Sequence, residues 1–411
     1  MKAGVAIVGS GILGAWTLVE ASRRAHPLSG PAMLLDGAQS GAHVPAPSGL
    51  ASEAFVHANL AGLARHGIEV AANFETSVGR KIHFGRPGAL VLGLDEPGRV
   101  VEQLAERRIE GASVLDAAGA QRVFRGIELG QGEDALWLAS AAHLDPRTYH
   151  SQLLDLARTL GAITRFRAGV QSLRIEGDRV TGLETAKGTI ETERVIVTSM
   201  QALEQLMATP VLASNGACSA FLTELQETTS TTSTASQSFT SPLVADDAGL
   251  DPSQPGLVAD IFADPSKLES YFTPSEAPTY SHPALVDLAA GTQVACAPAA
   301  GQLHFTGVGA MEPELSGGAL PEEPLGWLMR RLPFHGDSPK PEAGPTKIQS
   351  RTRTSGLPIA GKVPGIEGLF LAIASQERAI ELAPSLGEGV VQLAFNEPLV
   401  AFDGPGLGPL S

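Results

Sequence analysis

The stretch Val5-Ala6-Ile7-Val8-Gly9-Ser10-Gly11-Ile12-Leu13-Gly14-Ala15 decides the fold of this chain. It joins an apolar run to the pattern G-x-G-x-x-G, and the residues that follow are typical of a helix. In such a strand–turn–helix unit the first glycine makes a tight turn, the second lets the backbone approach a pyrophosphate, and the third lets the helix pack closely on the strand. The helix N-terminus then offers unpaired N–H groups to the anion. We therefore expect a dinucleotide to bind at this turn, through Gly9, Ser10, Gly11, Ile12, Leu13 and Gly14.

The residues after the turn strengthen this prediction. Residues 15–25 contain no Pro or Gly, and a second apolar run, Ala32–Leu35, stops at Asp36. An acid at the end of the second strand is where a ribose hydroxyl is held in dinucleotide-binding folds. We expect Asp36 to play that part, with Gly37 beside the cofactor. The alternative is a glycine-rich turn that binds no ligand.

Length and composition limit the class of protein. A chain of 411 residues exceeds a typical single domain, so two domains are expected. The formal net charge of -15 argues against a nucleic-acid-binding protein, which needs a basic face. Two cysteines, Cys218 and Cys296, cannot form a disulfide framework and fit a reducing compartment. No apolar run reaches the ~18 residues of a membrane-spanning helix. We expect a cytoplasmic protein with a small-molecule substrate, no integral membrane segment and no metal, and the oligomeric state is left open.

Four further segments carry structural signals. Asp145 is suited to cap a helix that starts at Pro146, and Gly161 ends that helix. Within residues 170–193, short strand-like runs are separated by turns that contain Gly, Asp and Lys, which predicts a β-meander. Residues 195–197 would then rejoin a parallel sheet. The Thr- and Ser-rich residues 227–241 form either an exposed strand or a loop, and Thr favours the strand. Residues 51–76 are predicted to form one long helix.

Together these segments resemble the FAD-dependent oxidoreductases of the D-amino-acid oxidase type, which include glycine oxidase and sarcosine oxidase. Four features carry the resemblance over nearly the whole chain. They are the glycine turn with Asp36, the segment Leu144-Asp145-Pro146 with its helix, the meander that ends in residues 194–199, and a C-terminal segment. That last segment is the most specific, and it reads Arg351-Thr352-Arg353-Thr354-Ser355-Gly356-Leu357-Pro358-Ile359-Ala360-Gly361, with Leu382-Ala383-Pro384-Ser385-Leu386-Gly387-Glu388 further on.

The resemblance implies an α/β fold with two domains. A Rossmann-like FAD-binding domain of the glutathione-reductase type, with a β-meander, is expected to comprise residues 1–76, 144–202 and 345–411. A mixed-sheet α+β substrate-binding domain is expected to comprise residues 77–143 and 203–344. The further cofactor-binding positions that the resemblance implies are Val170, Ser199, Gly361, Ser375, Gln376, Glu377, Arg378, Ala379 and Ile380.

The resemblance also implies a cofactor and a reaction. The cofactor is FAD rather than NAD, and the reaction is oxidation of a C–N bond in an amino acid or related amine by hydride transfer to flavin N5. Arg351 is similar in position to the family arginine that holds the substrate carboxylate, for which a guanidinium is a suitable two-pronged donor. Arg353 competes for this role, and an ordinary ion pair is the alternative for Arg351. His43 is either an exposed loop side chain or a contact, even a covalent link, to the flavin.

The chain departs from the family pattern in its C-terminal half. Residues 374–379 read Ala-Ser-Gln-Glu-Arg-Ala where the family places a glycine-rich turn before its last helix. Side chains therefore occupy positions at which the backbone approaches the flavin ring. Two alternatives stay open: an FAD enzyme that acts on a 2-hydroxy acid or an intermediate of a specialised pathway, and an FAD-binding protein that has lost catalysis.

Overall fold

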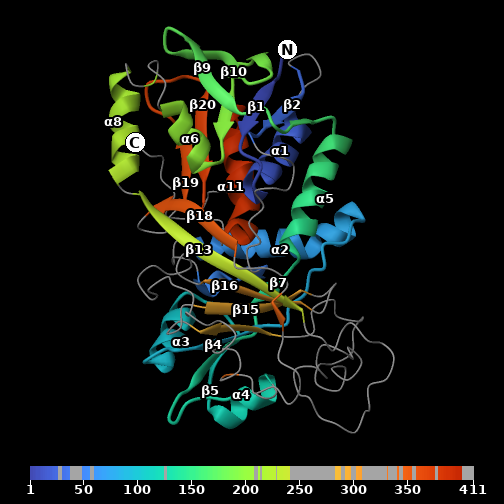
Figure 1. Cartoon of the computed structure of the whole chain (residues 1–411), viewed down its shortest axis with the longest axis vertical. Coiled ribbons are helices and arrows are strands. Elements are labelled where there is room, and N and C mark those ends of the chain that lie inside the picture. Colours follow the sequence, from blue (N-terminus) through green and yellow to red (C-terminus); the bar gives the residue numbers. More distant parts are fainter. Residues whose placement is uncertain are drawn as a thin grey trace.

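The computed structural model describes residues 1–25, 30–37, 49–55, 60–124, 127–207, 212, 215–227, 229–240, 283–287, 292–297, 302–307, 331, 340–341, 346–353, 358–374 and 378–399. Within these residues the chain forms two units that lie one above the other along the long axis of the molecule (Figure 1). Strands β13 (Thr229–Thr240) and β18 (Thr346–Arg353) belong to the second unit and lie at its boundary with the first.

The first unit is built on a mostly parallel sheet. In the described part of the chain its strands follow the order β19-β20-β12-β1-β2-β8. They are β1 (Val5–Val8), β2 (Ala32–Leu35), β8 (Ile163–Arg165), β12 (Val195–Val197), β19 (Ile359–Lys362) and β20 (Leu369–Ile373). Neighbours are parallel except for the edge pair of β19 and β20. All residues of β1, β2, β12 and β20 are buried, as expected for a parallel sheet that is covered on both faces.

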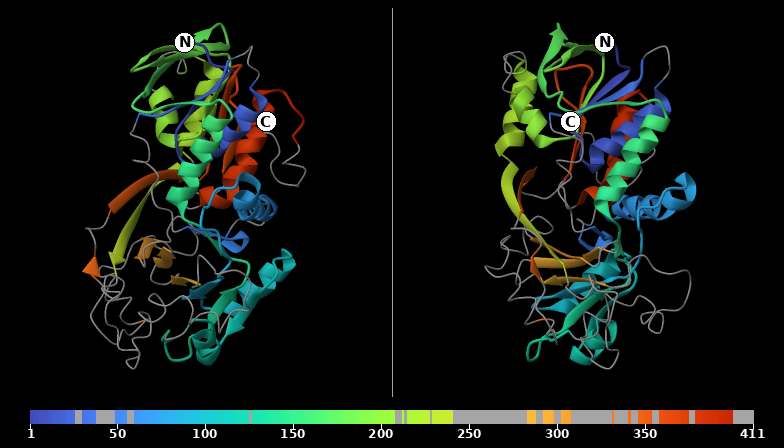
Figure 2. Two further views of the ribbon diagram at one scale, coloured as in Figure 1. Left: turned by 90° about the vertical axis from the view of Figure 1, so that its right-hand side faces the viewer. Right: turned by 45° about the vertical axis from the view of Figure 1, so that its right-hand side comes forward.

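Alternate residues of β1 pack into different layers, because successive side chains of a strand point to opposite faces. Val5 and Ile7 join a core with the helices α1 (Ile12–Arg24), α2 (Ala61–Val78), α5 (Pro146–Thr159) and α11 (Ala379–Ala394). Ala6 and Val8 join a core with the β-meander and the helices α6 (Met200–Met207) and α8 (Gly216–Glu227). Helices α5, α1 and α11 lie side by side (Figure 2). The first sheet is thus the middle of three layers.

The predicted helix start and the predicted meander are both confirmed. The Asp145 carboxylate accepts hydrogen bonds from the N–H groups of Arg147 and Thr148, and α5 begins at Pro146. The meander consists of β9 (Val170–Glu176), β10 (Arg179–Thr185) and β11 (Gly188–Glu191), which pair antiparallel.

Helix α5 is fixed to α1 by an aromatic cluster. The Trp16 indole N–H donates to the hydroxyl of Tyr149 over 2.7 Å, and Tyr149 is fully buried. Phe74 of α2 makes edge-to-face contacts with both rings. Burial raises the pKa of Tyr149 above its ordinary value although the hydrogen bond from Trp16 opposes this. The hydroxyl therefore stays protonated, and the cluster ties three helices together over the first sheet.

The second unit is a large mixed sheet, in which the described strands follow the order β17-β13-β16-β15-β14-β4-β6-β5. Besides β13 they are β4 (Ala89–Leu92), β5 (Ala112–Leu115), β6 (Ala135–Leu138), β14 (Ala284–Asp287), β15 (Thr292–Ala297), β16 (Gln302–Gly307) and β17 (Lys340–Pro341). Only the pair of β4 and β14 is parallel among these described neighbours. Helices α3 (Pro97–Glu106) and α4 (Ala117–Val123) pack on β5 and β6. The mixed-sheet prediction is confirmed, and so is the strand expected in the Thr- and Ser-rich segment, where β13 lies.

Two elements pack with the unit other than the one to which the sequence assigned them. Strand β18 lies in the segment that the sequence assigned to the FAD-binding domain, yet it pairs along its whole length with β13. Helix α8 lies in the segment assigned to the substrate-binding domain, yet Cys218, Leu222 and Leu225 pack in the core under the meander. The boundaries at residues 202 and 345 stay predictions, and these contacts connect the segments on either side of them.

The prediction of one helix over residues 51–76 is wrong in its first part. Ala51 belongs to a short strand, β3 (Leu50–Ala51), which pairs with β7 (Ala142–His143). A 3-10 turn follows at Glu53–Phe55, and α2 begins only at Ala61. The backbone pairing with β7 overrides the helical tendency of the side chains, because propensity is weak beside tertiary contacts.

Among the described residues, no helix combines the length and the apolar character needed to cross a membrane.

Candidate cofactor and substrate site

The turn after β1 leaves no room for a side chain at two of its three glycines. Gly9 adopts a φ of +116°, a value that residues with a Cβ rarely take. A Cβ at Gly14 would lie 2.0 Å from the Gly9 carbonyl oxygen, whereas a Cβ at Gly11 would meet nothing within 4 Å. The turn therefore packs strand against helix at Gly9 and Gly14, and it leaves open space at Gly11. That space is where the backbone of a dinucleotide-binding turn approaches the phosphates.

Helix α1 begins at the open side of the turn. Gly11 is its N-cap residue, no side chain caps it, and its first turn contains no acid. The first N–H groups of α1 have no partner within the helix, and they lie at the positive end of its dipole. Ile12 and Leu13 are each 4% exposed and pack in the core. They can therefore offer an anion their backbone N–H groups, while their side chains hold the helix in place.

Asp36 lies beside the turn, at the carboxyl end of β2. The Ser10 N–H donates to Oδ2 of Asp36 over 2.8 Å. The backbone of Asp36 is held as well, because its N–H donates to the Arg165 carbonyl and its carbonyl accepts from the Ala168 N–H. The structure thus brings the acid and the glycine turn together. The contact of Asp36 with a ribose stays a prediction.

A histidine that the sequence did not single out lies at the same corner. His150 of α5 is 3% exposed, and its Nε2 lies 2.5 Å from the Ser10 carbonyl oxygen. Burial lowers the pKa of His150; the hydrogen bond to Ser10 and the charge of Asp36 oppose this shift, while Arg158 adds to it. The imidazole is therefore neutral at pH 7. Since a carbonyl oxygen only accepts hydrogen bonds, Nε2 carries the proton.

The remaining predicted positions near the turn lie on neighbouring strand ends. A Cβ at Gly37 would lie 3.5 Å from the Gly169 Cα, directly before Val170, the first residue of β9. A Cβ at Gly9 would lie 2.8 Å from the Ser199 Cβ, at the carboxyl end of β12. Gly37 and Ser199 therefore lie on two sides of the turn, as expected when parallel strands end at one edge of a sheet. Val170 is 7% exposed and packs in the core below.

Gly361 is in register with the turn but lies at the far side of the sheet. Val8, Val197, Leu371 and Gly361 are consecutive partners across β1, β12, β20 and β19. Three strand spacings separate Val8 from Gly361, which corresponds to roughly 14 Å. A cofactor that contacts both must therefore extend along the carboxyl edge of the sheet.

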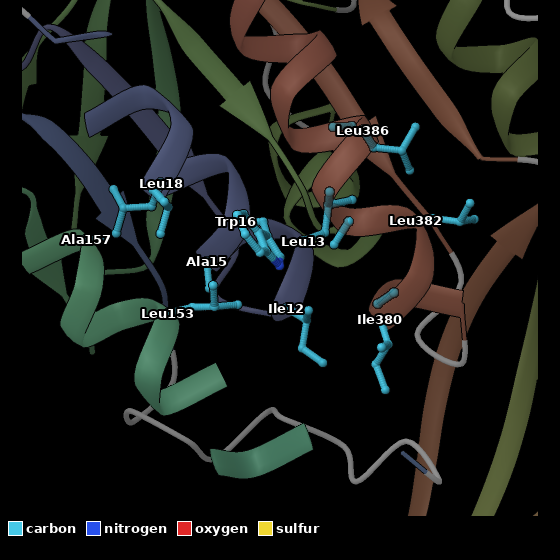
Figure 3. Packing of buried hydrophobic residues seen from close by; sticks show 14 of the residues in the cluster. Ile12, Leu13, Ala15, Trp16, Leu18, Leu153, Ala157, Ile380, Leu382 and Leu386 are labelled. Atoms are coloured by element: carbon cyan, nitrogen blue, oxygen red, sulfur yellow. The ribbon is translucent and has the colours of Figure 1, made fainter. Parts of the chain in front are cut away.

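Helix α11 begins at this same edge with a buried ion pair. The Arg378 guanidinium lies 3.3 Å from a carboxylate oxygen of Glu381, and the two side chains are 5% and 0% exposed. Ala379 and Ile380 are buried too, and Ile380 lies on the helix next to α1, which begins at Ile12 (Figure 3). The predicted contacts of Arg378, Ala379 and Ile380 with the cofactor stay predictions.

Several predicted positions lie outside the described residues, namely Ser375, Gln376, Glu377 and His43. For Arg351 and Arg353 the structure describes the backbone. Both belong to β18, opposite Thr231 and Thr229 of β13. Their predicted roles in holding a substrate carboxylate stay predictions.

A cleft of about 340 Å³ lies apart from the turn. Its walls carry acidic and basic side chains that pair with each other, as Glu53 does with Arg65 and Glu69 with Arg86. It is lined by Glu53, Arg65, Ile68, Glu69, Arg86, Arg108, Glu110 and Ser140, none of which is a predicted cofactor or substrate residue.

The described residues of the turn fit a dinucleotide cofactor on two observations. The space at Gly11 is open, and the first turn of α1, which carries the unpaired N–H groups, contains no acidic residue. Together with Asp36 they supply donors for a pyrophosphate and an acceptor for a ribose. Among the described residues, no group of three or more His, Cys, Asp and Glu side chains is arranged to hold a metal ion.

Sequence reasoning missed His150 because 140 positions separate it from Ser10. A signal for its burial was present. His150, Leu153, Leu154 and Ala157 lie three, four and seven positions apart, which is the spacing of one helix face, and all four are buried. The pattern predicts a buried imidazole, but it does not reveal its partner.

Comparisons with known proteins agree with this geometry. The family model described as FAD dependent oxidoreductase matches residues 4–393. A search of curated protein sequences gave no match.

Several solved structures share the fold. An L-amino acid deaminase from Proteus vulgaris, with a specific insertion deleted, is 16% identical with a TM-score of 0.70, over 98% of this chain and 93% of that one. Iminodiacetate oxidase from Chelativorans sp. BNC1 is 18% identical with a TM-score of 0.69, over 96% of each chain. Glycine oxidase from Geobacillus kaustophilus is 16% identical with a TM-score of 0.68, over 99% of this chain and 100% of that one. At these identities the likeness shows the fold.

Proposed function

The chain belongs to the family of FAD-dependent oxidoreductases, and from this premise we propose that it oxidises a C–N bond of an amino acid or a related amine. The observation that carries the proposal is the position of β18. This strand bears Arg351 and Arg353, pairs with β13 of the large sheet, and precedes β19 of the first sheet by only five residues. The two arginines therefore lie on the chain segment that links the large sheet to the first sheet, and Figure 1 shows β18 at the boundary between the two units.

Each part of the proposed site has a physical role. The N–H groups at Gly11 and Ile12 bind the pyrophosphate of FAD, and Asp36 accepts from the ribose. Arg351 binds the substrate carboxylate through two parallel N–H donors, which fixes the neighbouring carbon that bears the nitrogen. When bound, FAD supplies the hydride acceptor, at N5 of its ring. The protein's own contribution is to bind and orient both molecules.

The substrate class is tested by anaerobic reduction of the flavin in the purified holoprotein. Amino acids, secondary amines and the matching 2-hydroxy acids are added one at a time, and the flavin absorbance is followed. We expect at least one carboxylate that bears an amine to bleach the flavin and to yield a 2-oxo acid after hydrolysis of the imine. Bleaching by hydroxy acids alone, or by no compound, would contradict the proposal.

The arginine is tested with paired variants. Arg351→Ala is expected to raise KM for that substrate about 100-fold, because a two-pronged ion pair is lost, while Arg351→Lys restores part of the affinity. Arg353→Ala is the matched control, two positions away on the same strand. A larger effect at Arg353 than at Arg351 would assign the carboxylate to Arg353.

A second candidate is an FAD enzyme whose substrate is a 2-hydroxy acid or an intermediate of a specialised pathway. One observation favours it: Arg378, within residues 374–379 where the family pattern has a glycine-rich turn, is a long buried side chain that pairs with Glu381 of α11. The substrate panel distinguishes the two candidates directly. An oxidised flavin that no compound reduces, but that dithionite does reduce, would indicate lost catalysis instead.

A further inference from the structure

Both backbone groups of Ser10, at the centre of the glycine turn, are tied to side chains from distant parts of the chain. Its N–H donates to Asp36 over 2.8 Å, and its carbonyl oxygen lies 2.5 Å from Nε2 of His150. Asp36 follows β2, and His150 belongs to α5. The turn is therefore fixed by groups other than its own glycines.

The second of these hydrogen bonds sets the direction of the peptide between Ser10 and Gly11. The described chain contains no cis peptide bond, and in a trans peptide the N–H points opposite to the carbonyl. With the Ser10 carbonyl held toward His150, the Gly11 N–H must point away from α5. Gly11 is the residue at which the turn is open.

We infer that His150 is a positioning residue for the cofactor, which holds the Ser10–Gly11 peptide so that the Gly11 N–H is aimed at the pyrophosphate before FAD binds. The inference rests on the proposed cofactor site at this turn and adds a residue to it. A donor that is already in place lowers the cost of ordering the turn on binding.

The surroundings of His150 suit a permanent donor. The imidazole is 3% exposed, and the charged groups that act on it are Asp36 and Arg158. Two contacts hold the part of helix α5 that bears His150. The Asp145 carboxylate caps the start of the helix, and the Tyr149 hydroxyl accepts a hydrogen bond from the Trp16 indole. The ring therefore stays neutral and keeps its Nε2 proton directed at Ser10.

The test measures the Kd for FAD of the full-length apoprotein by flavin fluorescence. His150→Phe keeps the ring volume but removes the donor, and it is expected to weaken FAD binding about tenfold because the buried Ser10 carbonyl loses its partner. His150→Gln keeps an N–H donor and is expected to stay within about twofold of the wild type. ADP used as a competitor should show the same tenfold loss, since it carries the pyrophosphate.

The matched control is Tyr149→Phe, one position away on α5, which removes the hydrogen bond to Trp16 and leaves Ser10 untouched. It is expected to lower thermal stability without changing the Kd for FAD. Equal affinities of all three variants and the wild type would overturn the inference. An equal loss in all three would also overturn it, because the effect would then be a general weakening of α5.

A second measurement applies if His150→Phe does not fold. The 15N spectrum of histidine-labelled wild-type protein should show His150 as the neutral tautomer with the proton on Nε2, and the Nδ1-protonated form would overturn the inference. Failure of the proposed cofactor site at the turn can be distinguished from failure of the inference about His150. If the cofactor does not bind at the turn, Asp36→Asn and Gly11→Val would bind FAD as the wild type does, whatever His150 contributes.

Discussion

The two halves of the candidate cofactor site, the N-terminal turn and the start of α11, are held by different kinds of contact. Around the N-terminal turn, the atoms closest to Gly9 and Gly14 belong to the backbone and to the short side chains of Thr198 and Ser199. At the start of α11, the buried groups are the long charged side chains of Arg378 and Glu381. The first half is specified by close backbone contacts, and the second by an ion pair.

This difference bears on which half can vary. Gly9 and Gly14 admit no larger residue, so both glycines must be kept for the turn to form. At the start of α11 the contacts are made by side chains, and other side chains can replace them. We therefore expect the N-terminal half to determine cofactor binding and the C-terminal half to determine what this chain does with it.

The largest expected effect is at Gly14. A Cβ there would lie 2.0 Å from the Gly9 carbonyl oxygen and 2.9 Å from the Thr198 hydroxyl, and backbone must move to admit it. Gly14→Ala is expected to cost ~4 kcal/mol of stability and to abolish FAD binding, because strand and helix are forced apart. Urea unfolding and the flavin content of the purified protein measure the two effects.

Gly11→Ala is the matched control in the same turn. Its Cβ would meet no described atom within 4 Å, so the variant should fold with a loss under ~1 kcal/mol. Its FAD affinity should nevertheless fall about tenfold, since the added methyl takes up space that the phosphates need. Similar stability losses in the two variants would contradict the difference between closed and open glycines.

The next effect concerns the ion pair at the start of α11. Glu381→Gln keeps the shape of the side chain but replaces the carboxylate that faces the buried Arg378 guanidinium with a neutral amide. We expect a loss of ~3 kcal/mol in unfolding free energy. Arg378→Met combined with Glu381→Gln should recover part of that loss, because the buried positive charge is removed together with its carboxylate partner.

An exposed pair provides the control for this prediction. Glu69 and Arg86 also form an ion pair, but their side chains are 54% and 45% exposed. Glu69→Gln should therefore change stability by less than ~0.5 kcal/mol. If Glu381→Gln were equally mild, the second half of the site would not depend on its ion pair.

A smaller effect is expected where α2 crosses α11. A Cβ at Gly67 of α2 would lie 1.9 Å from the carbonyl oxygen of Glu381. Gly67→Ala is expected to cost ~2 kcal/mol, whereas Gly62→Ala in the same helix meets nothing within 4 Å and should stabilise the protein by up to ~1 kcal/mol. Chemical denaturation of both variants tests this, and stabilisation by both would show that α2 and α11 can separate freely.

Local signals were enough to predict much of the fold, including the strand, turn and helix that form one half of the candidate site. The glycine turn, Asp36, the Asp145 cap and the meander are each specified within a few residues, and the structure contains the elements they predict. The part that could not be predicted depends on contacts between distant residues. The contact of His150 with Ser10 and the pairing of β3 with β7 each join positions about 90 to 140 apart, and no local sequence pattern predicts either of them.

The smallest expected effect lies in the large sheet, where Arg331 holds two acids. Its guanidinium makes two hydrogen bonds with Glu133, at 2.6 and 2.9 Å, and two more with Asp287, at 3.1 and 3.3 Å. Burial raises the pKa of Glu133, but the hydrogen bonds from Arg331 and Gly130, with the charge of Arg331, outweigh it and leave the pKa below its ordinary value of 4.5. The folded state therefore favours the charged form.

The sign of the pH dependence follows from that lowered pKa. Since the unfolded chain binds the proton more readily, the stability that Glu133 contributes is fully present above pH 4.5 and is lost as the pH falls through the folded-state pKa. Glu133→Gln should cost ~1 kcal/mol at pH 7, and the difference from the wild type should shrink in urea unfolding below pH 4. FAD affinity should not change, because this cluster lies on the large sheet. A fall in FAD affinity would mean that the large sheet, and not only the turn and α11, takes part in holding the cofactor.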